Sequence, residues 1–177
     1  MLINDFSEDT TMGLFSFVTD AGSKLGGAVY DMLNDDEDIT KPVSIAPERM
    51  NAIRKTHIKA SLNAEFGEAA KDIIVAVDGD QVTLTGTIAD QETSEKVTLC
   101  AGNQRGVSSV DCQVVVENPA PEAQFYTVKS GDSLSKIAKE FYQNAGKYPV
   151  IFEANKPLLT DPNKIYPGQV LRIPAID

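Results

Sequence analysis

The chain has 177 residues, enough for one ordinary domain or two small ones, and its 42% hydrophobic and 24% charged residues are typical of a soluble globular protein. Its net charge of −10 argues against nucleic-acid binding and against charge-driven binding to anionic membranes, because both require clustered Lys and Arg. No apolar run approaches the ~20 residues that cross a bilayer, and the acidic start MLINDFSEDTT lacks the basic residues and apolar core of a secretory signal, so we expect a cytoplasmic protein.

The cysteines, Cys100 and Cys112, are expected to be free thiols, as is usual in a reducing compartment. They could pair only if the strands that carry them met. They are poor candidates for metal ligands, because the chain has one histidine, His57, and no CxxC motif.

The N-terminal part divides into a tail and a helical pattern. Residues 1–11 are polar and acidic, and we expect them to be disordered. The apolar residues that follow recur at steps of four and three, as on one face of a helix: Leu14, Val18, Ala21, Leu25, Ala28 and Met32. Because glycine weakens a helix, we expect a first helix that ends near Gly22 and a looser one to about Leu33. The acidic run NDDED completes this helical segment and linker, residues 12–46.

Residues 47–117 have the pattern of a second unit. Pro47 suits the first turn of a helix. The inward stripe of that helix is expected at Met50, Ile53, His57, Ala60 and Ala64. Two β-rich runs on either side of Asp78-Gly79 predict a hairpin. A helical pattern over 92–101 and a strand over 107–116 complete the order helix, strand, strand, helix, strand.

This unit resembles the BON domain in the stretches VDGDQVTLTGTI and GVSSVDCQVVV, which lie on either side of the second predicted helix. The resemblance implies an α-β-β-α-β fold. It also implies one alternative function, because BON domains are associated with phospholipid surfaces. The acidic net charge predicts that such a membrane adaptor would fail to bind anionic lipid.

A Pro-rich linker over residues 118–124 precedes the last unit, residues 125–177. The stretches YTVKSGDSLSKIA, FEANKP and IYPGQVLRIP resemble the LysM domain, which implies a β-α-α-β fold. Asp132 is expected to cap the first helix of this unit, and Asn155 to occupy the left-handed end of the second. The fold class predicted for the whole chain is therefore α+β.

The residues Gly131 to Leu134 spell GDSL, which also names a family of serine hydrolases. Such an enzyme needs a His to accept the serine proton. The family's late Asp-x-x-His falls on Asp161 to Lys164, where Lys stands in place of His. A turn with a helix cap is the favoured interpretation, and we expect no enzyme activity.

The LysM loops are a second candidate site. The resemblance implies that they bind glycans containing N-acetylglucosamine, such as peptidoglycan. The residues at the matching positions are Gly131, Asp132, Ser133, Leu134, Asn155 and Ile165. Because a cytoplasmic protein does not meet the cell wall, a contact with a partner protein or a brace for the other unit stays open as the role of this module.

The helices predicted to end at Gly22 and Gly102 form a third candidate. Helix C-termini present unpaired carbonyls and roughly half a negative charge. A cage of neutral carbonyls suits a large monovalent cation better than Mg²⁺ or Zn²⁺. From the pattern alone, two ordinary helix ends facing water are favoured over a site.

A resemblance across the chain reverses that preference. The stretches MGLFSFVTDAGSKL and AGNQRGVSSVD, together with the LysM unit, resemble the small cytoplasmic potassium-binding proteins of the BON–LysM type over residues 12 to 174. The resemblance implies a K⁺ sensor or buffer that changes conformation on binding, acts in potassium or osmotic stress and is not an enzyme. The ligands are expected to be backbone carbonyls at Val18, Ala21, Ser23, Gly102, Gln104 and Gly106.

The expected partner is the potassium ion, and we expect a monomer with at most weak dimerisation. The residues before Met12 exceed the family's pattern. Either translation begins at Met12 or the extension is a real tail.

Overall fold

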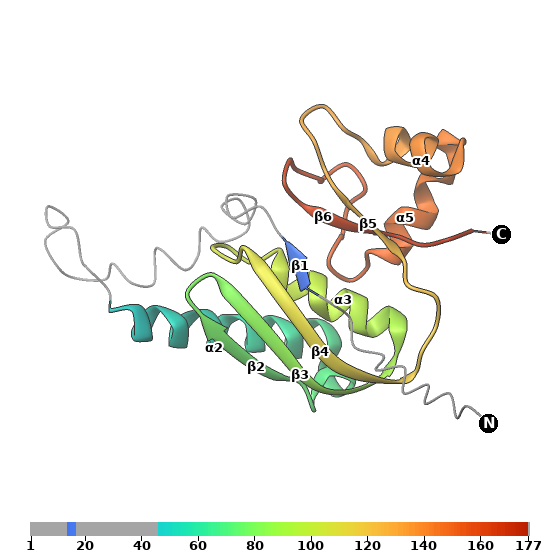
Figure 1. Ribbon diagram of the computed structural model, residues 1–177. Coiled ribbons are helices and arrows are strands. Elements are labelled where there is room, and N and C mark those ends of the chain that lie inside the picture. The colour runs from blue at the N-terminus through green and yellow to red at the C-terminus, as the bar shows by residue number, and fades with distance from the viewer. Residues whose placement is uncertain (1–13, 17–45, 177) are drawn as a thin grey trace, which may run out of the picture.

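The computed structural model describes residues 14–16 and 46–176, which form an α+β protein. In the first unit, the described strands make a four-stranded sheet in the order β1-β4-β3-β2. Strands β3 and β4 are parallel, and the other neighbours are antiparallel. The strands are β1 (Leu14–Ser16), β2 (Ile74–Asp78), β3 (Gln81–Asp90) and β4 (Ser109–Asn118). Helices α2 (Pro47–Phe66) and α3 (Gln91–Gly102) cover one face of this sheet, and the short helix η2 (Gly67–Ala70) follows α2 (Figure 1).

The second unit is smaller and pairs its first strand with its last. Strands β5 (Gln124–Thr127) and β6 (Val170–Ile173) are antiparallel. Between them lie α4 (Leu134–Tyr142), η3 (Ala145–Lys147) and α5 (Tyr148–Ala154). This is the β-α-α-β order that the LysM resemblance implies, and it stands beside the end of the first sheet in Figure 1.

The hairpin predicted at Asp78-Gly79 is confirmed as the β2–β3 turn. A further glycine of this unit is required by close packing. Gly86 has a φ of +126°, and a Cβ built there would lie 2.2 Å from the main-chain oxygen of Asp72. The glycine of the TLTG stretch therefore lets strand β3 pass the end of strand β2.

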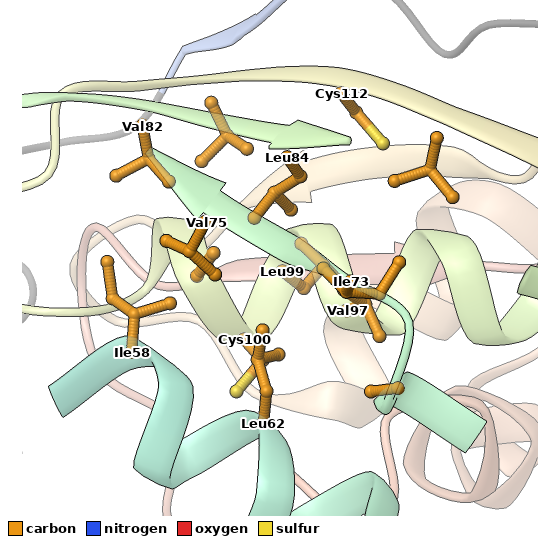
Figure 2. Packing of buried hydrophobic residues seen from close by; sticks show 14 of the residues in the cluster. Ile58, Leu62, Ile73, Val75, Val82, Leu84, Val97, Leu99, Cys100 and Cys112 are labelled. Atoms are coloured by element: carbon orange, nitrogen blue, oxygen red, sulfur yellow. The ribbon is translucent and has the colours of Figure 1, made fainter. Parts of the chain in front are cut away.

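The core of the first unit lies between the sheet and its helices. Figure 2 shows Ile58 and Leu62 of α2 pointing toward strand side chains and toward residues of α3. The buried face predicted for α2 is wrong, because His57, Ala60 and Ala64 are exposed. The inward face instead carries Arg54, Ile58, Leu62 and Phe66 at steps of four. The alanines of the predicted stripe have too little apolar surface to fix which face of a helix is buried.

The helix predicted from Met12 is wrong over residues 14–16, which form strand β1. This strand pairs antiparallel with β4, with Leu14 opposite Asp111 and Ser16 opposite Ser109. A short apolar run such as LFSFV fits a strand or a helix equally well by periodicity. Pairing with the exposed edge of β4 decides in favour of the strand, a tertiary effect that local pattern does not contain. The rest of the predicted helical segment, and the tail over residues 1–11, lie outside the described residues.

Two local expectations for the second unit are also wrong. Ser133, not Asp132, is the N-cap of α4, and its side chain accepts a hydrogen bond from the backbone N–H of Lys136 at 3.3 Å. Asn155 has a φ of −106°, outside the left-handed region. Both residues instead use their side chains to hold backbone elsewhere in the unit, as described below.

Over residues 46–176, no helix combines the length and the apolar character that a membrane span requires.

Candidate functional site

The C-terminal end of helix α3 is buried and carries no basic side chain in its last turn. Leu99, Cys100, Ala101 and Gly102 are all buried there. The helix begins at the N-cap Asp90, which accepts a hydrogen bond from the N–H of Thr93 at 2.8 Å. Because the last turn of α3 carries no Lys or Arg, no side chain of that turn offsets the partial negative charge of the helix end.

The loop after α3 satisfies some carbonyls of the last turn and leaves others. The N–H of Asn103 donates to the oxygen of Leu99 at 2.9 Å, and the side-chain amide of Gln104 donates to the oxygen of Cys100 at 3.1 Å. The oxygen of Gln104 accepts from the N–H of Val107 at 3.3 Å. Within residues 14–16 and 46–176, no hydrogen bond reaches the oxygens of Gly102 and Gly106. Of the predicted carbonyls in this loop, these two have their full acceptor capacity.

Three anchors fix the loop in place. The side chain of Asn103 donates to the oxygen of Val170 and accepts from its N–H, both at 3.0 Å, so β6 of the second unit holds one side. The N–H of Ser108 donates to the oxygen of Asp80 at 2.8 Å, which ties the other side to the β2–β3 turn. The third anchor is the side chain of Arg54 on α2, which lies against Gly106.

Strand β1 brings the N-terminal segment close to this loop. Its last residue, Ser16, lies opposite Ser109, three residues after Gly106. The other predicted carbonyls, at Val18, Ala21 and Ser23, lie outside the described residues. The structure therefore describes the half of the predicted site that lies in residues 102–106.

The chemistry of this half fits a weakly hydrated monovalent ion. Over the described residues, no group of three or more His, Cys, Asp or Glu side chains could hold a metal ion. The oxygens available at the end of α3 are neutral main-chain carbonyls. Such oxygens suit K⁺, whereas Mg²⁺ and Zn²⁺ require carboxylate, imidazole or thiolate ligands.

The residues predicted to contact glycans differ in their exposure to solvent. Gly131 and Ser133 are exposed, while Asp132 and Ile165 are half-buried. Leu134 and Asn155 are each 2% exposed and so offer almost no surface to a sugar.

Asp132 holds the first loop of the second unit closed. It accepts hydrogen bonds from the N–H of Lys129 and from the hydroxyl of Tyr126, both at 2.8 Å. The bond from Lys129 is the main cause that lowers the pKa of Asp132, with the Tyr126 hydroxyl and nearby lysine charges adding to it. The pKa of Tyr126 is raised to about 12, chiefly by burial and then by its bond to the Asp132 carboxylate.

The two units meet at a buried ion pair. The carboxylate of Glu95 on α3 is fully buried, and its Oε2 lies 2.5 Å from Nε of Arg172 on β6. Its Oε1 accepts from the N–H of Ala123 at 2.9 Å and from the amide of Gln91 at 3.2 Å. Each carboxylate oxygen of Glu95 therefore has a partner, as a buried charge requires.

Cys100 and Cys112 are free thiols, as expected from the sequence, and both are buried. Burial, with a smaller contribution from the charge of Glu65, raises the pKa of Cys100 to about 12. The Cys100 thiol is therefore protonated at neutral pH and unsuited to metal ligation or nucleophilic chemistry.

Sequence reasoning missed Arg54 and Asn103, which position the loop, and Glu95 and Arg172, which join the two units. The one signal available was the place of Asn103, directly after a helix that ends in glycine. Charged residues such as Glu95 and Arg172 are expected at the surface, and no local pattern indicates that they meet across 77 residues of chain.

Comparison with known proteins defines the class of this chain. Residues 51–118 match the BON domain family and residues 126–174 match the LysM domain family. The chain is thus a two-module protein with one domain of each kind, and neither family is a family of enzymes.

Two relatives then narrow the class. The chain is 50% identical over 163 residues to the potassium binding protein Kbp of Escherichia coli O6:H1, covering 92% of this chain and 99% of that protein. It therefore belongs to the BON–LysM family of that protein. It is also 34% identical over 152 residues to an uncharacterized protein of Deinococcus radiodurans, covering 79% of this chain and 55% of that longer protein.

Proposed function

We propose that this protein binds K⁺ through backbone carbonyls of Gly102, Gln104 and Gly106, joined by those of Val18, Ala21 and Ser23. The observation that carries the proposal is the 50% identity to a potassium binding protein over 99% of that protein's length. The buried, dipole-bearing end of α3 supports it, because that end presents neutral oxygens and no basic side chain in its last turn.

Chain connectivity supports the second half of the ligand set. In the sequence, only one residue separates Val18 from Ser16, the last residue of β1. That end of β1 lies opposite Ser109, next to the loop that carries Gly106.

The finer biological role is part of the same proposal. The protein acts in the cytoplasm as a K⁺ sensor or buffer, changes conformation on binding and serves in potassium or osmotic stress. It is a binding protein rather than an enzyme. An ion that joins two segments distant in the sequence favours the conformation in which they meet, which is the physical basis of such a change.

A cation titration tests the proposal. The melting temperature of the purified chain is followed by circular dichroism in KCl, RbCl, NaCl and CaCl₂, with ionic strength held constant. K⁺ should raise the melting temperature in a concentration-dependent way, because it binds the folded state only. Na⁺ should do much less. Equal shifts with K⁺ and Na⁺ would mean a general salt effect and would refute the proposal.

Glycan binding by the LysM module is retained as a second candidate, supported by the domain match over residues 126–174. Its contacts would come from Gly131, Asp132, Ser133 and Ile165, which keep accessible surface. A peptidoglycan pull-down of the full chain, compared with Ile165→Ser, tests this function. Glycan binding is supported if the unmodified chain is retained on peptidoglycan and Ile165→Ser is not. It is refuted if the unmodified chain stays in the supernatant.

A further inference from the structure

The side chain of Arg54 places a positive charge beside the loop that carries Gly106. Its Nη1 donates a hydrogen bond to the oxygen of Gly79, and the N–H of Gly79 donates to the side chain of Asn51 at 3.1 Å. The guanidinium also packs on Gly106. A Cβ built at that glycine would lie 2.7 Å from Nη2 and 3.4 Å from Cζ of Arg54.

This charge has no carboxylate partner in the part of the chain that the structure describes. The ion pairs over residues 46–176 involve Lys71, Lys96, Lys156, Lys164 and Arg172. Among the described residues, the Nη1 of Arg54 bonds to a neutral main-chain carbonyl, that of Gly79. A positively charged side chain next to a proposed cation site lowers the affinity of that site for cations.

We propose that Arg54 is a specificity-determining residue of this site: its fixed charge beside Gly106 excludes divalent cations while monovalent ions still bind. The inference rests on the proposed function, because it assumes that K⁺ binds at the loop over residues 102–106. It assigns to the site a preference that is set by charge as well as by the size of the ion.

The physical reason is the way each energy depends on ion charge. The attraction between an ion and fixed dipoles, and its repulsion from a fixed charge, are both proportional to the ion's charge. The cost of removing the ion from water rises more steeply, roughly with the square of that charge. Neutral carbonyls with the end of α3 can offset this cost for K⁺. Arg54 reduces the attraction twice as much for a divalent ion as for a monovalent one.

Other charges near the loop do not replace this role. Arg105 is an exposed residue of the loop itself. Asp80 is exposed on the β2–β3 turn and contacts the loop through its main-chain oxygen, which accepts from Ser108. Arg54 differs from both because its guanidinium is held between Gly79 and Gly106.

The test compares K⁺ with Ba²⁺, which has nearly the ionic radius of K⁺ and twice its charge. Affinities of the full chain for both ions are measured by isothermal titration calorimetry at constant ionic strength. Arg54→Met removes the charge and keeps most of the apolar stem. Arg49→Met is the matched control, because Arg49 is an exposed arginine on the same helix and its loss changes the net charge equally.

In Arg54→Met, K⁺ affinity should rise by roughly three- to tenfold, and Ba²⁺ affinity by roughly the square of that factor. Arg49→Met should leave the Ba²⁺/K⁺ affinity ratio within about twofold of the unmodified protein. Arg54→Lys, which keeps the charge, should also preserve the ratio more closely than Arg54→Met.

Loss of the bond to Gly79 can weaken folding, so melting curves without added K⁺ or Ba²⁺ accompany each titration. If Arg54→Met does not fold, Arg54→Gln replaces it, because this neutral side chain can still donate to the Gly79 oxygen. Equal changes in K⁺ and Ba²⁺ affinity would mean that Arg54 only positions the loop, and this would overturn the inference. An unmodified chain that binds no K⁺ would instead refute the proposed function.

Discussion

At the scale of single residues, backbone conformation and packing both favour glycine at position 106. Its φ of +77° lies in the left-handed region, which costs a residue with a Cβ roughly 1–2 kcal/mol. A Cβ there would also press on the guanidinium of Arg54 at 2.7 Å. The glycine therefore allows the loop after α3 to turn while the guanidinium of Arg54 lies close to it.

Gly106→Ala should destabilise the protein by roughly 1–3 kcal/mol, from backbone strain plus displacement of Arg54. It should also weaken K⁺ binding at least tenfold, because the carbonyl at position 106 would change direction. Urea unfolding and a K⁺ titration measure the two effects. Gly67→Ala is the control, since Gly67 has a φ of +50° but open space around the position of a Cβ. Equal losses of K⁺ affinity in both variants would contradict a special role for Gly106.

The residue scale is also where sequence reasoning was weakest. Gly102 follows a helical pattern in the sequence, and α3 ends at this residue. Arg54, by contrast, belongs to α2 and acts on a loop 52 residues later, through packing that no spacing rule contains. Glycines that end helices can be found from sequence, whereas the side chains that pack on them depend on the tertiary structure.

At the scale of elements, strand β6 shows how an exposed edge is closed by side chains. One edge of β6 pairs with β5. On the other edge, the N–H and C=O of Arg172 bind the side chain of Asn155 at 2.8 Å each, and those of Val170 bind Asn103. Each asparagine thus takes the place of a neighbouring strand, which removes an edge that could pair with another chain.

Asn155→Ala should destabilise the LysM unit by roughly 2–4 kcal/mol. It removes bonds to Ile151 and Arg172 and leaves the N–H and C=O of Arg172 buried without partners. Chemical unfolding followed by far-ultraviolet circular dichroism measures this loss. The control is Asn163→Ala, since Asn163 is exposed and its hydrogen bond to Asp161 uses its own backbone N–H. A loss no larger than that of the control would contradict a structural role for the Asn155 side chain.

Most elements could be predicted from local patterns, and the failures have a common cause. The hairpin at Asp78-Gly79 and the helix beginning at Pro47 depend on turn and cap residues next to each other in the sequence. The strand at residues 14–16 depends on the edge of β4, almost a hundred residues away. The buried face of α2 depends likewise on what the sheet offers to Ile58 and Leu62. Local chemistry predicts element type well only when no distant partner competes with it.

At the scale of the whole molecule, the two modules share a continuous interface along α3 and β6. Glu95 pairs with Arg172 near the middle of α3, and Asn103 pairs with Val170 just beyond its end. The loop that carries Gly102 and Gly106 therefore contacts the LysM module directly through Asn103. Any rearrangement of the loop on cation binding would therefore act on this interface as well.

The Glu95–Arg172 pair provides a test of this coupling. Arg172→Met leaves the fully buried Glu95 carboxylate without its cation and should cost roughly 3–5 kcal/mol of folding free energy. The double variant Glu95→Gln with Arg172→Met should cost markedly less, because no unpaired charge stays buried. Lys71→Met, which breaks the exposed Glu68–Lys71 pair, should cost less than about 1 kcal/mol. Urea unfolding of all three variants gives the comparison. If Arg172→Met lowers the free energy of unfolding no more than Lys71→Met does, the Glu95–Arg172 pair contributes too little to couple the LysM module to the loop over residues 102–106.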